Sequence, residues 1–234
     1  MNIYCPFCDD VRKAKAFGVA SGIFQTRTVV DAGPRPLARC GTCLAFERER
    51  MLHSCLIDRI GTNDCTLLHF APSRATSKWL QTFENVTAVN TDLFPDKYRR
   101  VGEVVRSDIT QLQFDDASFD FVVCSHVMEH IPDDVKAMRE VHRVLKPGGS
   151  AFFMVPLLID GEGPLEDPSI KSPRKRLAAF GQKDHVRIYD APTFLTRLQT
   201  IGFAAEIYDP FADDPVKAVA YGVGQGNAVL IGKA

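Results

Sequence analysis

The chain has 234 residues, of which 45% are hydrophobic and 24% charged, and its formal net charge is -1. These values are ordinary for a globular protein and leave room for one large α/β domain plus a small appendage. The near-neutral charge argues against bulk electrostatic binding to nucleic acid, although local basic patches remain possible. No apolar run approaches the roughly 20 residues of a membrane span, and residues 5–15 lack a signal-peptide pattern. We therefore expect a cytoplasmic protein.

The first feature along the chain is a pair of Cys-x-x-Cys motifs, Cys5 with Cys8 and Cys40 with Cys43. Each motif can form a tight turn that brings two sulfurs to one ion, and four thiolates favour tetrahedral zinc. In a reducing compartment, seven cysteines indicate metal ligands or free thiols rather than disulfides. The sequence predicts a zinc-ribbon-like module over residues 1–45. Iron in the same ligand set is the alternative.

The role predicted for this metal is structural. About fifty residues with few large apolar side chains cannot build much core, so a closed metal site would supply folding energy instead. Residues 22–30 contain β-branched and aromatic side chains suited to short strands, and Gly41 should ease the second turn. A helix over residues 46–60 follows, with Cys55 as a core thiol on its apolar face. Residues 46–62 would link the module to the main domain.

Three short apolar runs then predict buried parallel strands at residues 66–70, 86–90 and 104–107. After the first run, Ser73 is placed to cap a helix. Asp108 directly follows the third run. A loop-capping role is common for an aspartate in such a position.

The stretch between Asp108 and Gly149 carries the clearest pattern. An apolar strand over residues 119–124 ends at a polar loop. A helix then begins at Asp133, where negative charge suits the positive end of the helix dipole. A Pro-Gly-Gly sequence ends the helix and leads into a strand over residues 150–155. Strand, helix and strand in this order imply a right-handed crossover in a parallel sheet.

This stretch resembles the central part of class I S-adenosylmethionine-dependent methyltransferases of the type 11 kind. The resemblance implies an α/β fold with a doubly wound, mostly parallel seven-stranded sheet. Strands at residues 203–208 and 228–231 would complete the sheet as an antiparallel pair at one edge. The sequence Leu68-His69-Phe70-Ala71-Pro72 resembles a bacterial subgroup that also carries the N-terminal cysteine pairs. The methyltransferase domain would then run over residues 63–234.

The resemblance also implies how S-adenosylmethionine binds. A carboxylate after the second strand, Asp92, would accept both ribose hydroxyls, with Asn90 as its competitor. Asp108 would take the adenine amino group. Class I enzymes usually follow the first strand with a glycine-rich loop, whereas this chain has Ala71 as the smallest residue there. The expected cofactor-binding residues are His69, Phe70, Ala71, Asp92, Asp108, Ile109 and Ser125.

Residues 157–189 form a long polar insertion after the fifth strand, which we expect to cover the cleft as a lid. Within it, Asp184 could orient His185 as a base that takes a proton from the acceptor. Arg187 could bind an acceptor carboxylate or phosphate, and Tyr189 lies beside it on the substrate side. The alternative is a hydrogen-bonded cluster that only pins the insertion.

A second candidate for the base lies in the loop after the fourth strand. His126 follows Ser125 there, and ligands of open α/β sheets lie at the carboxyl ends of strands. His126 and His130 are spaced i, i+4, a spacing that can bind metal. Without a third ligand the pair is a weak metal signal.

Together these features predict an enzyme that transfers the methyl group of S-adenosylmethionine to an acceptor. The first candidate for the acceptor is a hydroxyl of a small molecule or glycan. An RNA methyltransferase that uses the basic stretch between Lys171 and Arg187 is one alternative. A non-catalytic zinc-dependent binding module is another. A dinucleotide oxidoreductase is disfavoured, because no Gly-x-Gly-x-x-Gly follows a predicted strand.

Overall fold

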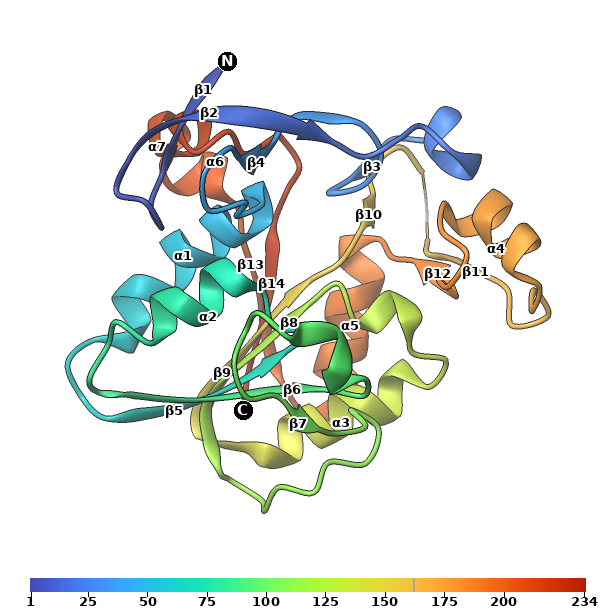
Figure 1. Cartoon of the computed structure of the whole chain (residues 1–234). Coiled ribbons are helices and arrows are strands. Elements are labelled where there is room, and N and C mark those ends of the chain that lie inside the picture. The colour runs from blue at the N-terminus through green and yellow to red at the C-terminus, as the bar shows by residue number, and fades with distance from the viewer. Residues whose placement is uncertain (162) are drawn as a thin grey trace.

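The structure is a computed structural model that describes residues 1–161 and 163–234. Its centre is a seven-stranded sheet in the order β13-β14-β9-β8-β5-β6-β7 (Figure 1). Five of these strands are mutually parallel: β5 (Cys65–Phe70), β6 (Val86–Asp92), β7 (Val105–Arg106), β8 (Phe119–Ser125) and β9 (Leu145–Met154). The other two are β13 (Ala204–Tyr208) and β14 (Val229–Lys233), and β14 runs antiparallel to both of its neighbours. The predicted antiparallel pair at one edge is confirmed.

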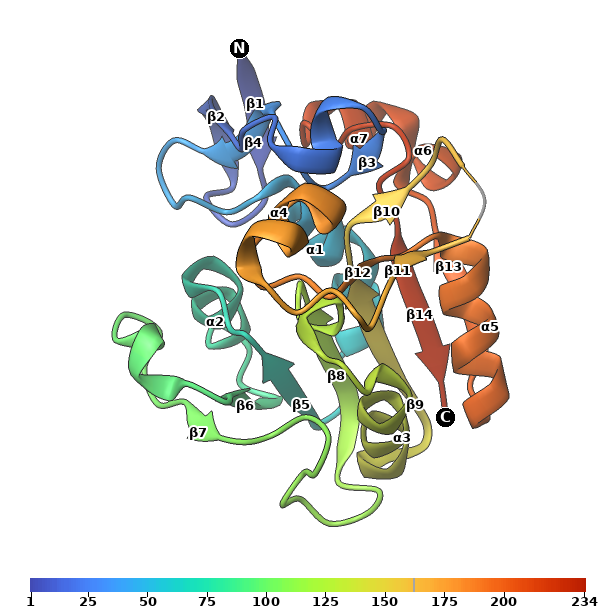
Figure 2. The ribbon, with the colours of Figure 1, turned by 90° about the vertical axis from the view of Figure 1, so that its right-hand side faces the viewer.

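Helices cover both faces of the sheet, which makes the fold doubly wound as predicted (Figure 2). One face carries α1 (Glu47–Ile60) and α2 (Arg74–Leu80), and the other carries α3 (Asp134–Val144) and α5 (Ala191–Ile201). Shorter helices are α4 (Pro173–Phe180), α6 (Pro210–Asp213) and α7 (Pro215–Ala220), with 3-10 turns η1 (Gly22–Gln25), η2 (Pro95–Tyr98) and η3 (Met128–His130).

The core follows from the two-residue period of the central strands. In β8, Val122 packs with the α3 and α5 side, whereas Val123 packs with the α1 side. In β9, Phe153 and Phe152 divide in the same way. Both faces of these strands are therefore apolar, and this is why each strand reads as a continuous hydrophobic run in the sequence. Burying each such side chain contributes about 1.5–3 kcal/mol.

The predicted helix boundaries depend on capping side chains. Ser73 Oγ accepts a hydrogen bond from the Thr76 amide at 3.1 Å. Asp133 and Asp190 cap α3 and α5 in the same way, at 3.0 and 2.9 Å. Gly202 ends α5 with a φ of 119°, a left-handed value that favours glycine.

The Pro-Gly-Gly sequence lies elsewhere than predicted. We expected it to separate the helix from the strand, but α3 ends at Val144 and β9 already begins at Leu145. Phe119 pairs with Leu145 and Phe121 with Ser150, so residues 146–149 form an irregularity inside the strand pairing. A β-bulge accommodates the proline and the two glycines, so the strand continues past them.

The N-terminal module is a three-stranded antiparallel sheet of β1 (Asn2–Cys5), β2 (Asp10–Phe17) and β4 (Arg35–Cys40). The expectation of short strands within residues 22–30 is met only in part. Residues 22–25 form η1, and only β3 (Val29–Val30) is extended. β3 pairs with β10 (Leu157–Leu158) of the insertion, not with the module's own strands. A pattern of β-branched residues does not reveal so distant a partner.

The insertion leaves β10 and returns through β11 (Leu165–Glu166), α4 and β12 (Arg187–Ile188). β11 and β12 pair with each other. Glu162, which belongs to the predicted insertion over residues 157–189, lies outside the described residues. Across the described ranges, no helix has both the length and the apolarity needed to cross a membrane.

The helix α1 ties the module to the large sheet through Arg50, whose side chain is fully buried. Its guanidinium donates to the carbonyls of Leu37 (2.8 Å) and Ala45 (2.7 Å) in the module, and to the carbonyl of Tyr221 (2.6 Å) near the C-terminus. Cys55, on the same helix, is buried in the core as predicted.

Candidate active site

Two cavities lie at the carboxyl ends of β5, β6 and β8. The strand-end cavity, of about 450 Å³, is lined by residues after β5, β6, β7 and β8. The loop cavity, of about 250 Å³, is lined by the start of α2 and by residues of the N-terminal module and α1. Ala71 borders both. All seven residues predicted to contact the cofactor line one or both cavities: Phe70, Asp92, Asp108 and Ile109 the first, His69 and Ser125 the second, and Ala71 the two together.

The loop after β5 has no glycine, yet it adopts a backbone conformation that glycine usually supplies. Ala71 has a φ of 47°, in the left-handed region that non-glycine residues rarely occupy. Its amide donates to the Thr91 carbonyl at 3.1 Å, which ties the turn to the neighbouring strand. Ser73 then caps α2, so the N-terminus of this helix borders the loop cavity.

Two carboxylates border the strand-end cavity at positions fixed by their own loops. Asp92 accepts hydrogen bonds from the Phe94 amide at 2.7 Å and the Tyr98 hydroxyl at 2.9 Å. Asp108 accepts from the amide and the hydroxyl of Thr110 at 2.8 and 2.7 Å. Both aspartates therefore cap their own loops and also line the cavity. Asn90, the competitor of Asp92, accepts from Ser77 Oγ at 3.1 Å and lines neither cavity.

A third cavity, the module cavity, of about 410 Å³, lies between the N-terminal module and the end of α4. Phe17 and Phe24 contribute apolar walls, and Arg35 contributes a charged one. His126 lines both this cavity and the strand-end cavity, so it stands at their boundary. A larger cavity of about 630 Å³ beside β13 and α5 includes none of the predicted site residues in its lining.

His126 is held between two carboxylates. Its Nε2 lies 2.5 Å from Asp31 Oδ2, and its Nδ1 lies 3.1 Å from Glu129 Oε1. Burial and the nearby Arg48 oppose the charged imidazole, but the carboxylates of Asp31 and Glu129 outweigh them and raise the pKa of His126. With a carboxylate at each ring nitrogen, His126 has no free lone pair directed at a cavity. The expected role of His126 as a base finds no support in this geometry.

Asp31 and Glu129 are site residues that the sequence did not reveal. Both are buried. Asp31 comes from the N-terminal module, where its carboxylate also pairs with Arg35 at 2.8 Å and Arg48 at 3.4 Å. Burial alone would raise the pKa of Asp31, yet His126 and the arginines lower it to about 2. The only local signal for Glu129 was its place beside two histidines.

The insertion arranges its candidate residues differently from the prediction. His185 is fully buried, its Nδ1 lies 3.2 Å from the Phe180 carbonyl oxygen, and burial lowers its pKa to about 4. The carboxylate of Asp184 lies 3.4 Å from Nδ1 of His130. The expected pairing of Asp184 with His185 is therefore wrong. Because His185 is buried and lines none of the three cavities, an acceptor in them does not reach it as a base.

Arg187 and Tyr189 also face the protein interior. Arg187 donates to the Pro132 carbonyl at 2.9 Å and to Glu166 at 3.0 Å, and Tyr189 donates to Asp134 at 2.7 Å. Both are buried, and neither lines any of the three cavities. The geometry fits the alternative in which this cluster pins the insertion to η3 and α3. The predicted contacts of Arg187 and Tyr189 with substrate find no support.

The four module cysteines converge at one point. Their sulfurs lie within 4.8 Å of one another, with Cys5 and Cys43 at 3.5 Å and Cys8 and Cys40 at 3.9 Å. A tetrahedral zinc with Zn–S bonds of about 2.3 Å requires sulfur separations of about 3.8 Å, so the arrangement fits the ion. A Cβ on Gly41 would lie 2.6 Å from the Lys13 carbonyl oxygen. Glycine is therefore needed in the second turn for close approach.

The family of methyltransferase domains matches residues 71–153. The demethylmenaquinone methyltransferase of Staphylococcus epidermidis is 47% identical over 47 residues, which are 20% of this chain and 20% of that protein. The corresponding Staphylococcus aureus protein is 32% identical over 99 residues, covering 38% of this chain and 37% of that one. The chain thus spans only about a fifth of the first relative's length.

Solved structures show the same fold. An S-adenosylmethionine-dependent methyltransferase from Mesorhizobium loti aligns with a TM-score of 0.53 at 17% identity, over 77% of this chain and 96% of that one. The sheet order and the helices on both faces are those of class I methyltransferases. Residues 71–153, which match the family of methyltransferase domains, lie within this fold.

Proposed function

We propose that this chain, with its methyltransferase domain, transfers the methyl group of S-adenosylmethionine to a hydroxyl of a small molecule or glycan. One observation carries the proposal. The carboxylates of Asp92 and Asp108 border one cavity at the carboxyl ends of the strands, and the left-handed turn at Ala71 joins that cavity to the start of α2. Ligands of open α/β sheets bind at this edge.

Each part of the donor has chemically suitable residues. Asp92 would accept hydrogen bonds from the ribose hydroxyls, and Asp108 would accept from the adenine amino group beside Ile109. The methionine part would occupy the loop cavity, whose lining includes Arg39 and Arg48. Guanidinium groups suit the carboxylate of the methionine part.

The acceptor would enter through the module cavity, which meets the strand-end cavity at His126. In the reaction the acceptor oxygen attacks the sulfonium methyl carbon, the carbon–sulfur bond breaks, and sulfur keeps the electron pair. The hydroxyl proton passes from the acceptor oxygen to solvent water. Because the donor carries its own leaving group, positioning of the two reactants supplies most of the acceleration. His126 is then a positioning residue that holds the boundary between the two cavities.

A structural zinc ion on the four cysteines supports the same arrangement. When bound, the ion would join the turn after β1 to the turn after β4. Residues of β2 and of the segment before β4 form one wall of the module cavity. Cys43 also lines the loop cavity, so the metal would stabilise the module on both the proposed acceptor side and the proposed donor side.

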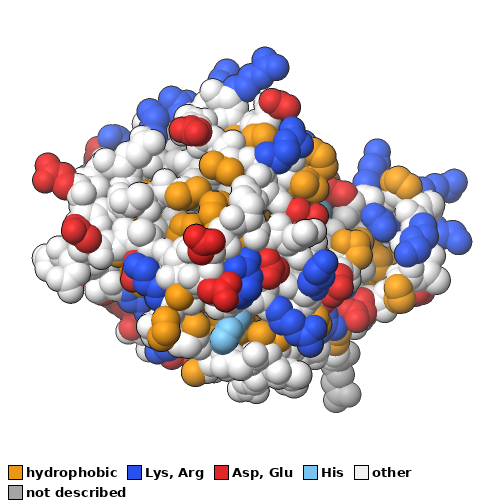
Figure 3. Space-filling model, turned by 90° about the horizontal axis from the view of Figure 1, so that it is seen from below, with side chains coloured by type: hydrophobic (Ala, Val, Ile, Leu, Met, Phe, Trp, Pro, Cys, Tyr) orange, Lys and Arg blue, Asp and Glu red, His pale blue; other side chains and the backbone are white. Residues whose placement is uncertain are grey.

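The basic residues of the insertion favour a second candidate, an RNA acceptor. Lys171, Arg174 and Lys175 are exposed on and just before α4, and Figure 3 shows lysine and arginine side chains gathered at the end of the molecule where α4 lies. A steep fall of RNA binding with salt would support this candidate over a small-molecule acceptor.

Two measurements test the proposal. Calorimetry with S-adenosylmethionine should show one binding site per chain. Methyl transfer from labelled donor into fractionated cell extract should then identify the acceptor class, with demethylated menaquinone added as a defined candidate because of the partial relatives. A chain that folds but binds no donor would instead be a non-catalytic binding module.

A further inference from the structure

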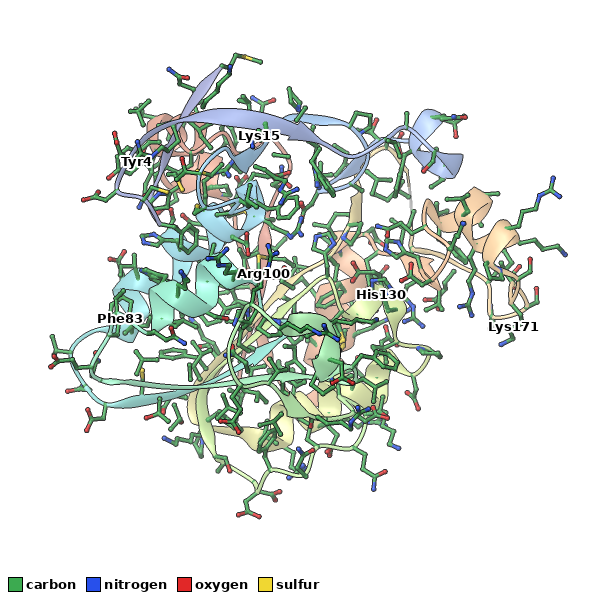
Figure 4. All side chains as sticks on the ribbon, in the orientation of Figure 1. Tyr4, Lys15, Phe83, Arg100, His130 and Lys171 are labelled. Carbon is green, nitrogen blue, oxygen red and sulfur yellow. The ribbon has the colours of Figure 1, made fainter. Side chains whose placement is uncertain are left out.

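We propose that Glu129, His130 and His185 bind a divalent transition-metal ion beside the strand-end cavity. Each residue offers one ligand atom, and these atoms lie within 4.8 Å of one another. Ligands bound at about 2.1 Å to one ion lie about 3–4 Å apart, so small side-chain rotations would complete the site. Glu129 and His130 come from η3, and His185 comes from the insertion. Figure 4 shows His130 between the sheet and the segment that carries Lys171.

The strongest indication of a ligand is a group of buried polar atoms without partners. Glu129 and His185 are both 0% exposed. Among the described residues, His185 Nε2 and both carboxylate oxygens of Glu129 lack a hydrogen-bond partner, although His126 Nδ1 approaches one oxygen to 3.1 Å. His126 offsets part of the charge of Glu129, but the carboxylate accepts no hydrogen bond within the described residues, and native proteins satisfy such buried groups by pairing or by a metal. One cation would satisfy the carboxylate and the imidazole nitrogen together.

The surrounding contacts prepare both histidines to act as ligands. The Phe180 carbonyl can only accept, so the proton of His185 belongs on Nδ1, which lies 3.2 Å from it. Nε2 then carries the lone pair that a metal needs. His130 Nδ1 lies 3.4 Å from the Asp184 carboxylate. A carbonyl or carboxylate behind the imidazole is the usual second contact of a metal-bound histidine.

The donor set selects the class of ion. Two imidazoles and one carboxylate suit zinc, ferrous iron or cobalt better than calcium or magnesium. Three protein ligands leave at least one coordination position open. Of the three ligands only His130 lines the strand-end cavity, where it is 31% exposed, so access to an open position would lead past His130. Resting on the proposed function, the bound ion would hold the acceptor oxygen and ease loss of its proton.

Cobalt(II) alone is the probe, added to the full-length protein after chelator treatment and without methyl donor. We expect two cobalt equivalents per chain, one with intense thiolate charge-transfer bands and one without. Glu129→Gln and His130→Gln should each remove only the equivalent without thiolate bands. His142→Gln is the matched control, because His142 is half-buried on α3 and outside the cluster.

His130 is partly exposed, so its variant keeps the test decisive if the buried Glu129 variant fails to fold. A parent protein that binds only the thiolate-held cobalt would overturn the proposal. Two equivalents in the folded His130→Gln protein would overturn it too, as would loss of the second equivalent in His142→Gln. Because no methyl donor is present, failure of this test leaves donor binding and methyl transfer to be judged separately.

Discussion

The Asp31 carboxylate lies 2.5 Å from Nε2 of His126, which follows it by 95 positions in the chain. Asp31 belongs to the N-terminal module, and His126 belongs to the loop after β8, at the boundary between two cavities. Arg35 and Arg48 complete a buried ionic cluster around the same carboxylate. The module is therefore joined to the carboxyl edge of the sheet by charge as well as by apolar packing.

Replacing Asp31 with Asn tests this junction. The change leaves Arg35, Arg48 and His126 without their shared anion, and removing one partner from a buried ion pair costs roughly 3–5 kcal/mol. The free energy of unfolding, measured by urea denaturation, should fall by that amount. Asp10→Asn is the control, because Asp10 is exposed and pairs with Arg12 at the surface. It should change stability by less than about 0.5 kcal/mol. Equal effects of the two substitutions would contradict a special role for Asp31.

Replacing Asp92 or Asp108 with Ala tests the donor site. Each change removes a charge-assisted hydrogen bond, worth roughly 1.5–3 kcal/mol. The affinity for S-adenosylmethionine should therefore fall about tenfold to a hundredfold, as measured by calorimetry. Asp96→Ala is the matched control, since its carboxylate is 93% exposed in η2 and does not line the strand-end cavity. Parent-like affinity in both cavity variants would show that the ribose and adenine assignments are wrong.

Replacing Cys40 with Ser tests the thiolate metal site. Loss of one of four ligands should weaken cobalt binding, reduce and shift the thiolate-to-cobalt bands, and destabilise the module, because metal binding contributes directly to its folding. Cys65→Ser is the control, as Cys65 is buried at the start of β5 and stands apart from the cluster. It should keep the bands. Parent-like bands and parent-like cobalt affinity in the Cys40 variant would contradict the assignment of Cys40 as a ligand.

Replacing Arg50 with Lys tests the link between α1, the module and the C-terminal segment. A lysine cannot reproduce the planar fork of donors, so carbonyls of Leu37, Ala45 and Tyr221 lose their partners. Hydrogen bonds to charged groups contribute about 1.5–3 kcal/mol each, so the loss of unfolding free energy should reach about 3 kcal/mol or more. Arg59→Lys, at a partly exposed pair with Glu206, should cost below about 1 kcal/mol. A similar small loss for Arg50 would disprove its anchoring role.

The large sheet could be predicted because short stretches of sequence mark each of its strands and helices. Continuous apolar runs mark the central strands, and the capping residues Ser73, Asp133 and Asp190 mark where helices begin. The positions of Asp92 and Asp108 beside one cavity followed from the same order, since parallel strands bring their carboxyl ends to one edge.

The acceptor side could not be predicted in the same way. The contact of Asp31 with His126, and the cluster that joins His185 to Glu129, depend on how distant segments dock. The periodicity of hydrophobic residues within one segment does not indicate which distant segment it contacts. Burial also changed the role expected from one sequence motif. Arg187 looked suited to substrate in the sequence, but its guanidinium donates to the Pro132 carbonyl and to the Glu166 carboxylate instead.

The pairing of β3 with β10 has a consequence for motion. It holds the module against the insertion with strands of only two residues each, Val29–Val30 and Leu157–Leu158. Segments with so few backbone hydrogen bonds open locally at a small free-energy cost, whereas β8 and β9 exchange only when the core opens. Amide hydrogens of Val30 and Leu157 should thus exchange with solvent far sooner than those of Val122 and Phe153. The proposed acceptor side can therefore open locally while the strands beside the proposed donor site stay paired.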